Sequence, residues 1–150
     1  VLEDRAHPGE LVGVMFCDLD GFKAINDSFG HQVGDDVLCA ATSLISSSVR
    51  PGDVVARLGG DEFVVVLDAV KGRDGGQHVA QKLVSVLDGG YWVNDLVRVP
   101  TVSVGLCLAE GTWKAEDLLS AADEALYEAK RAGGGQFSVR ELSAPDDGGL

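Results

Sequence analysis

The sequence is poor in the features that define several large classes of protein. Its 150 residues include 12 lysines and arginines against 24 aspartates and glutamates, and aromatic residues make up only 6%. The net charge of −12 argues against a nucleic-acid or anionic-membrane surface. No apolar run approaches the roughly 20 residues that span a bilayer, and no signal-peptide pattern opens the chain. We therefore expect one domain that contacts neither nucleic acid nor membrane.

Cysteine is scarce and follows no ligand pattern. Cys17, Cys39 and Cys107 form an odd set in apolar segments, with no C-x-x-C or Cys/His spacing. Buried free thiols in a reducing compartment explain them better than disulfides or zinc do. These features predict a cytoplasmic domain, although the full-length protein could be tethered to a membrane through other segments.

Strands and helices alternate along the chain. The apolar run 11–17 predicts a strand covered on both faces, and the runs 54–58 and 63–67 predict a β-hairpin. The amphipathic segment 34–49 predicts a helix ended by Pro51-Gly52. The later part predicts a helix near 79–87, entered through a glycine-rich bend at 72–76. A turn at Asn94-Asp95 then separates two strand-like runs, of which 99–108 is expected to be a central strand. The last elements expected are a helix capped by Thr112, with an apolar stripe to Ala129, and an edge strand at 136–140. This order favours an α/β sandwich, with helices packed on a mixed central sheet.

The most informative local feature is the turn of the predicted hairpin. Gly59-Gly60 precedes two adjacent carboxylates, Asp61 and Glu62. Glycine at the bend permits positive φ and close approach of another group. On its own this string also fits an ordinary hairpin with a solvated acidic turn.

A second acidic strand end makes a site more plausible. The first predicted strand runs into Asp18-Leu19-Asp20, where alternation places the two aspartates on one side. If the two strands are neighbours, one carboxylate from each and a backbone carbonyl form the hard-oxygen ligand set that Mg²⁺ prefers. Such a cluster suits phosphoryl transfer, because it neutralises charge at the reacting phosphorus.

The segment between this strand and the next helix carries candidate nucleotide contacts. Lys23 is a cation within reach of phosphates, and Asn26 and Asp35 suit the donors and acceptors of a guanine edge. Helix capping by Asn26-Asp27 or Asp35 explains the same residues equally well.

The ordered motifs together resemble the GGDEF-type diguanylate cyclase family from about residue 11 to residue 130. The matching motifs are Asp18-Leu19-Asp20-Gly21-Phe22-Lys23-Ala24-Ile25-Asn26-Asp27, Gly30-His31, Gly34-Asp35, Arg57-Leu58-Gly59-Gly60-Asp61-Glu62-Phe63, Ser103-Val104-Gly105 and Ala122-Asp123-Glu124-Ala125-Leu126-Tyr127-Glu128-Ala129-Lys130. The resemblance implies a palm-like fold of the adenylyl-cyclase type, with a βαββαβ core flanked by helices. It also implies condensation of two GTP molecules into cyclic di-GMP and pyrophosphate, by a homodimer that uses Mg²⁺ or Mn²⁺.

The resemblance also implies roles for individual residues. Asp18, the carbonyl of Leu19 and Asp61 would hold the metal, and Asp61 would accept a proton with Glu62 as a further acidic aid. Lys23 would stabilise charge at the transferring phosphate. The nucleotide would be bound by Phe22, Asn26, His31, Asp35 and Lys130.

A separate motif resembles the family's product-inhibition site. Arg50-Pro51-Gly52-Asp53 matches R-x-x-D, and arginine can pair bidentately with guanine or phosphate. Arg50 also fits a plain helix end, where its charge complements the helix dipole.

Two departures qualify the resemblance. The family usually has Gly-Arg-Asn after its last helix, whereas this chain has Gly133-Gly134-Gly135 and so lacks a phosphate-binding arginine; Arg131 could replace it only if the helix end shifts. The family's D-x-L-T-x-L-x-N-R segment is also missing before Val1, so we expect the domain, residues 1–140, to lack its first helix, and residues 141–150 to be a flexible tail or linker in a longer protein with regulatory domains.

Two functions remain open. The first is a Mg²⁺-dependent cyclase, favoured by the presence of Asp18, Lys23, Asp61 and Glu62 together. The second is a module that binds GTP or cyclic di-GMP and regulates an attached domain, favoured by Gly134 in place of arginine.

Overall fold

The structure, a computed structural model, describes residues 10–144. Its elements in chain order are β1 (Leu11–Leu19), α1 (Phe22–Phe29), α2 (His31–Ser48), β2 (Val54–Gly59), β3 (Glu62–Val70), α3 (Gly72–Leu87), β4 (Trp92–Val93), β5 (Val97–Arg98), β6 (Val102–Ala109), α4 (Ala115–Arg131) and β7 (Phe137–Leu142). Five strands form a central sheet in the order β2-β3-β1-β6-β7. Only β6 and β7 are parallel in this sheet, and β4 and β5 form a separate ribbon.

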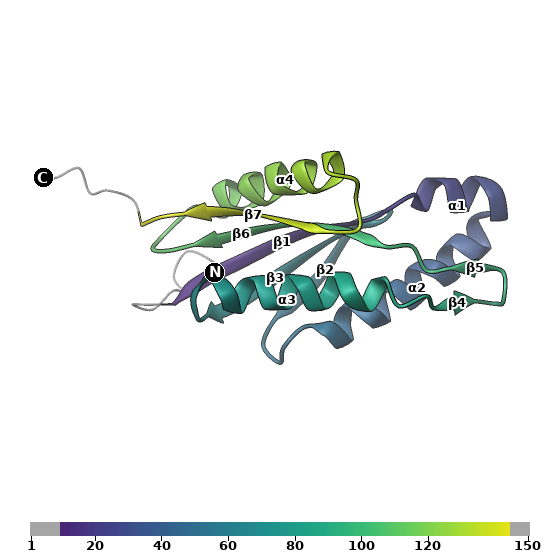
Figure 1. The fold of residues 1–150 in the computed structure, drawn as a ribbon, viewed down its shortest axis with the longest axis horizontal. Coiled ribbons are helices and arrows are strands. Elements are labelled where there is room, and N and C mark those ends of the chain that lie inside the picture. Colours follow the sequence, from purple (N-terminus) through teal and green to yellow (C-terminus); the bar gives the residue numbers. More distant parts are fainter. Residues whose placement is uncertain (1–9, 145–150) are drawn as a thin grey trace, which may run out of the picture.

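Helices cover both faces of the sheet (Figure 1). α4 lies along one face, and α2 and α3 lie side by side on the other. The order β1, α1 and α2, β2, β3, α3, β6 is the βαββαβ core, followed by α4 and β7. The mixed α+β sandwich expected from the alternation of the chain is confirmed.

The strands divide their side chains between two apolar cores. On β1, Val12 and Val14 pack toward α4, while Met15, Cys17 and Leu19 pack in the core on the side of α2 and α3. This division follows from the two-residue period of a strand. β6 is buried at all its positions, as predicted for a central strand.

Gly105 on β6 sets how closely α4 approaches the sheet. A Cβ atom at this position would lie 2.1 Å from the carbonyl oxygen of Ala122 and 2.2 Å from the backbone nitrogen of Leu126. The backbone of α4 therefore lies directly over this glycine, which explains why a residue without a side chain stands in a buried strand.

The segment after β1 differs from the expectation. It forms α1 and then α2, and α2 begins at His31 rather than at residue 34. The break between the two helices falls at Gly30, whose φ of 89° favours glycine. Gly34 lies inside α2, where the Oδ1 atom of Asn26 occupies the space that a Cβ would need.

Four further boundaries differ. The glycines at 72–76 belong to the first turns of α3 instead of a bend, and the central strand begins at Val102, after Pro100. Thr112 does not cap α4, because the helix begins at Ala115 and its cap position is Lys114, which makes no side-chain capping bond. β7 continues through Leu142, two residues into the expected tail, and residues 145–150 lie outside the described part.

The predicted turn at Asn94-Asp95 is confirmed. The prediction that the three cysteine thiols are buried is confirmed for two of them. Asn94 and Asp95 have φ values of 53° and 58°, as in the turns that join short hairpins. Cys17 and Cys107 are buried, and burial raises the pKa of these thiols to about 12 and about 11. The prediction was wrong for Cys39, which is exposed on α2.

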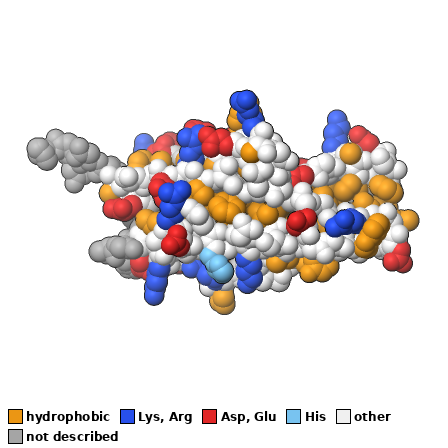
Figure 2. Space-filling view, viewed as in Figure 1, with side chains coloured by type: hydrophobic (Ala, Val, Ile, Leu, Met, Phe, Trp, Pro, Cys, Tyr) orange, Lys and Arg blue, Asp and Glu red, His pale blue; other side chains and the backbone are white. Residues whose placement is uncertain are grey.

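The surface has one apolar end. Figure 2 shows hydrophobic side chains gathered where α1, β4 and β5 lie. The large exposed hydrophobic residues of these segments are Phe29, Tyr91, Trp92 and Leu96. Across residues 10–144, none of the helices combines the length and the apolar character that crossing a bilayer requires.

We predict that Gly105→Ala destabilises the fold by about 2–3 kcal/mol, because α4 must move away from β6 to admit the methyl group. Gly75→Ala is the matched control. It lies in α3, and its nearest neighbour, Val70 Cγ1, would be 3.4 Å from the new Cβ. Urea denaturation should show the control to be neutral or slightly more stable. Equal midpoints for both variants would contradict the proposed contact.

Candidate functional site

The two acidic strand ends meet at one edge of the sheet. β1 and β3 are adjacent and antiparallel, and Asp18 lies opposite Glu62 in their register. The amide of Leu19 also donates a hydrogen bond of 3.3 Å to the carbonyl oxygen of Asp61. The two strands that end in acidic residues are therefore neighbours, which was the condition for a shared site.

The side chains of Asp18 and Asp61 share this edge. Burial, followed by the proximity and charge of the Asp18 carboxylate, raises the pKa of Asp61 to about 6. Two carboxylates this close repel each other when both are ionised, so one of them retains its proton more strongly. Glu62, the next residue, is exposed at the start of β3.

Lys130 balances part of this negative charge. Its ammonium group forms an ion pair with Oδ2 of Asp18. Partial burial tends to lower the pKa of Lys130, but the hydrogen bond to Asp18 and the charges of Asp18, Asp61 and Asp20 raise it overall. In this state the last turn of α4 supplies the counter-ion of the acidic edge.

Asp18 keeps one oxygen available for another cation. Its Oδ1 atom is buried and has no hydrogen-bond partner. A buried oxygen without a partner, next to a second carboxylate, fits a divalent cation. Within residues 10–144, no three histidine, cysteine or acidic side chains converge as a metal cage. Magnesium sites commonly use one or two carboxylates, with water and substrate phosphates as the other ligands.

Asp20 has different partners from Asp18. Its carboxylate accepts hydrogen bonds from Thr101 Oγ1 at 2.7 Å, Ser103 Oγ at 2.6 Å and the amide of Gly135 at 2.9 Å. Leu19, between the two aspartates, is buried in the core on the side of α2 and α3. The predicted alternation therefore holds, and Asp20 joins the sheet to the loop after α4.

The candidate base-binding residues lie on α1 and at the start of α2. Phe22 is buried, Lys23 is exposed, and Asn26 packs against Gly34. Neither Asn26 nor Asp35 caps a helix, because the cap positions of α1 and α2 are Gly21 and Gly30. Helix capping is thereby excluded as the explanation for both residues.

A groove of about 610 Å³ lies beside Asp35. Leu38, Cys39, Thr42, Ser43 and Arg57 complete its lining. His31 is exposed at the start of α2 and does not line this groove. No role was predicted for Arg57 from the sequence, although its place two residues before the Gly59-Gly60 turn was a usable signal. Its Nε atom donates a hydrogen bond of 3.0 Å to the carbonyl of Gly60.

The R-x-x-D motif is closed by its own hydrogen bonds. Arg50 contacts both carboxylate oxygens of Asp53, at 3.0 Å from Nε and 2.9 Å from Nη2, and also donates to the carbonyl of Asp68. The Asp53 side chain is only 1% exposed, whereas that of Arg50 is 39% exposed. The motif precedes β2 and the acidic turn follows it, so the length of this strand separates the two regions.

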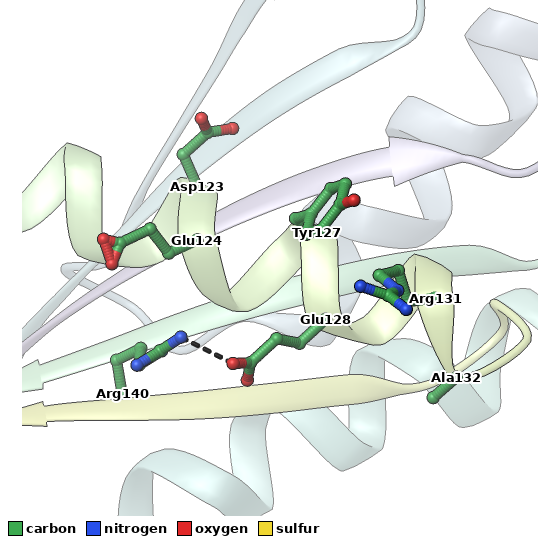
Figure 3. Close-up of a pocket in the computed structure, with 7 residues that line it drawn as sticks. All are labelled: Asp123, Glu124, Tyr127, Glu128, Arg131, Ala132 and Arg140. Atoms are coloured by element: carbon green, nitrogen blue, oxygen red, sulfur yellow. Dashed lines mark hydrogen bonds and ion pairs between the residues drawn. The ribbon is translucent and has the colours of Figure 1, made fainter.

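A larger groove lies elsewhere, on the outer side of α4 (Figure 3). Its volume is about 750 Å³, and it is lined by Asp123, Glu124, Tyr127, Glu128, Arg131, Ala132 and Arg140. Arg131 lies over the Tyr127 ring, 5.8 Å from its centroid. Arg131 is therefore turned toward this outer surface and does not replace the missing phosphate arginine. None of the predicted site residues lines the groove.

Comparison with known proteins agrees with the motifs. The family model described as "Diguanylate cyclase, GGDEF domain" matches residues 1–136. The bifunctional diguanylate cyclase/cyclic di-GMP phosphodiesterase MucR of Pseudomonas aeruginosa is 39% identical over 132 residues. That alignment covers 87% of this chain but only 19% of MucR, so the chain spans about a fifth of this relative.

Solved structures agree as well. An EAL/GGDEF domain protein from M. capsulatus is 38% identical with a TM-score of 0.79, covering 95% of this chain and 91% of that one. The GGDEF domain of DgcB from Caulobacter crescentus, solved in complex with c-di-GMP, is 27% identical with a TM-score of 0.76, covering 88% and 79%.

The paired carboxylates predict a pH-dependent stability. The pKa of Asp61 is raised from 3.8 to about 6 in the folded state, so this state binds more protons than the unfolded chain between about pH 4 and pH 6. Folding stability therefore falls as the pH rises through that window, and the loss is complete above it. We expect metal-free Asp61→Asn to be more stable than the wild type by about 1 kcal/mol at pH 8, after allowance for solvent screening.

Urea denaturation in a chelator at pH 8 and pH 4.5 measures this effect, and the advantage of Asp61→Asn should shrink at the lower pH. Asp123→Asn, an exposed change on α4, controls for loss of a carboxylate as such. A stability difference that is independent of pH would refute the prediction.

Proposed function

Because the chain belongs to the GGDEF diguanylate cyclase family, we propose that it condenses two GTP molecules into cyclic di-GMP with release of pyrophosphate. The observation that supports this proposal most directly is the meeting of Asp18 and Asp61 at the ends of the adjacent strands β1 and β3. A domain that served only as a scaffold would have no use for two carboxylates in mutual repulsion.

The family generally uses a divalent metal, and here we propose Mg²⁺ or Mn²⁺. Asp18, the carbonyl of Leu19 and Asp61 would hold it, with Oδ1 of Asp18 as the oxygen that now has no partner. When bound, the metal neutralises phosphate charge and acidifies the attacking hydroxyl. Lys130, now paired with Asp18, would then be available to contact the terminal phosphates of GTP, because the metal would balance the charge of the carboxylate.

Asp61 and its neighbours would carry out the proton transfer. The 3′-hydroxyl of one GTP attacks the α-phosphate of the other, the new O–P bond forms as the bond to pyrophosphate breaks, and Asp61 accepts the hydroxyl proton. In the metal-free protein burial and Asp18 raise the pKa of Asp61 to about 6. A bound metal would favour the ionised carboxylate, which is the form that accepts a proton. Lys23 would stabilise charge at the transferring phosphate, with Glu62 as an additional acidic group.

Nucleotide binding would fall to α1 and α2. Asn26 and Asp35 offer an amide and a carboxylate to the guanine edge, Phe22 an aromatic surface, and His31 a further polar contact. The groove beside Asp35 gives the base an entrance bounded by Leu38 and Arg57. Each domain holds one GTP, so the symmetric reaction requires two copies of the chain facing each other, at least transiently.

The first test is synthesis itself. A dimerised form of the protein, incubated with GTP and Mg²⁺, should release cyclic di-GMP that mass spectrometry detects, and Asp61→Ala should reduce the rate by at least about 100-fold, since the metal ligand and the base are lost together. Glu124→Gln, on the exposed side of α4, is a control for altered charge. A folded, dimeric wild type without product would favour the alternative function.

That alternative is a domain that binds GTP or cyclic di-GMP and regulates an attached domain. It is favoured by Gly134 in place of the family's arginine, together with the outward orientation of Arg131. Loss of one charge-assisted phosphate contact commonly costs about 1.5–3 kcal/mol, which would weaken GTP binding without abolishing it. For this reason we favour the enzyme.

We also propose that Arg50 and Asp53 form a product-inhibition site. Arg50 is exposed enough to exchange its bonds for a guanine or phosphate group, whereas buried Asp53 anchors the turn through the amides of Arg50 and Asp68. Arg50→Ala should therefore weaken the binding of cyclic di-GMP at least about tenfold, as calorimetry can measure. Arg73→Ala, at an exposed and ion-paired arginine of α3, serves as the matched control. If Arg50→Ala bound cyclic di-GMP with unchanged affinity, the proposal of a product-inhibition site at Arg50 would be refuted.

A further inference from the structure

Asp20 makes more side-chain hydrogen bonds than its neighbours at the acidic edge. Thr101 and Ser103 donate hydroxyl hydrogens to it, and Gly135 donates its amide hydrogen. The backbone adds a fourth connection, because the amide of Asp20 donates to the carbonyl of Thr101 at 2.9 Å. The two hydroxyl groups and the backbone amide are all neutral donors, and a carboxylate binds such donors more strongly than a neutral acceptor does.

These bonds join three segments that are far apart in the sequence. Asp20 follows β1, Thr101 directly precedes β6, Ser103 is its second residue, and Gly135 lies in the loop between α4 and β7. The loop connects Asp20 to the end of α4 over only a few residues. Within it, the amide of Gly133 donates to the carbonyl of Lys130 and the amide of Gly134 donates to that of Ala129.

The loop can reach Asp20 because of its glycines. Gly133, Gly134 and Gly135 have φ values of 122°, 75° and 65°, a run of positive angles that residues with side chains rarely adopt. A Cβ atom on Gly134 would also lie 3.2 Å from Oδ1 of Asp20. The backbone thus passes close over the carboxylate, and the amide of Gly135 points at it.

We propose that Asp20 is a positioning residue that fixes the end of α4 against β1, so that the ammonium group of Lys130 is held at Asp18. This inference deepens the proposed function, because Lys130 is the cation that we expect to pass from Asp18 to the phosphates of GTP. A lysine side chain is a flexible chain of four methylene groups. Less conformational entropy is lost in placing its ammonium group when the backbone that carries it is already fixed.

The position of Lys130 can be read in the free protein, without nucleotide or metal. In NMR spectra we expect a hydrogen-bonded ammonium signal for Lys130 and a displaced amide signal for Gly135. Asp20→Ala should abolish both, while Asp20→Asn, which retains an acceptor of the same shape, should preserve much of them. Thr101→Val removes one donor only and provides a milder variant if Asp20→Ala fails to fold.

The comparison of Asp20→Ala with Asp20→Asn separates position from charge. If Asp20 acted on Lys130 only through its negative charge, the asparagine variant would lose the Lys130 signal as completely as the alanine variant. Persistence of the Lys130 ammonium signal in Asp20→Ala, or in folded Thr101→Val together with an unchanged Gly135 signal, would overturn the proposal. Asp123→Asn, an exposed change on α4, should alter neither signal.

A double-mutant cycle tests the link to substrate binding. Calorimetry with a non-hydrolysable GTP analogue and Mg²⁺ should show roughly tenfold weaker binding in Asp20→Ala, and little further loss when this change is added to Lys130→Met. If Asp20 had a merely structural role, Asp20→Ala would lower thermal stability, and it would weaken analogue binding by the same factor in the wild type and in Lys130→Met. Such additive losses of affinity would refute the inference. If the wild type binds no analogue, the proposed function fails, and the free-protein spectra still decide the role of Asp20.

Discussion

The repulsion between Asp18 and Asp61 is the constraint on which the rest of the site depends. The sheet brings their strands together, and the resulting charge must be balanced by a proton, by Lys130 or by a metal ion. The ion pair of Lys130 shows the second solution in the structure. The raised pKa of Asp61 favours the first at acidic pH. A site in which a proton, a lysine or a metal ion can balance the same negative charge suits a negatively charged substrate that binds together with a divalent ion.

The fold keeps the two carboxylates together by placing β1 in the centre of the sheet. β1 pairs with β3, which begins at the acidic turn, and with β6, whose first residues hold Asp20. Gly105 on β6 lets α4 lie directly against the same strands, so Lys130 reaches Asp18 from the last turn of that helix. The geometry of the site therefore depends on packing between segments more than 80 residues apart in the chain.

Local patterns predicted much of this arrangement. The hairpin, the first strand, the central strand and the last helix were visible because turn glycines and apolar periodicity are local signals. α1 was missed because Gly21 to Asp35 carries many polar residues, and the role of Gly30 as a break appears only in its φ. The Lys130 ion pair and the partners of Asp20 could not be predicted, since they join residues that no periodicity connects.

The loop Gly133-Gly134-Gly135 after α4 is the place where this chain lacks the arginine that is usual in its family. The same loop passes close to Asp20 at the acidic edge. An arginine at position 134 would have to adopt a φ near 75°, with its Cβ 3.2 Å from Asp20. In this conformation the loop cannot carry a phosphate-binding side chain without strain. What the loop provides instead is the amide of Gly135, which connects Asp20 to the end of α4. On the function and positioning role proposed above, the chain would replace one cation that contacts phosphate directly with a backbone contact that fixes the position of another, Lys130.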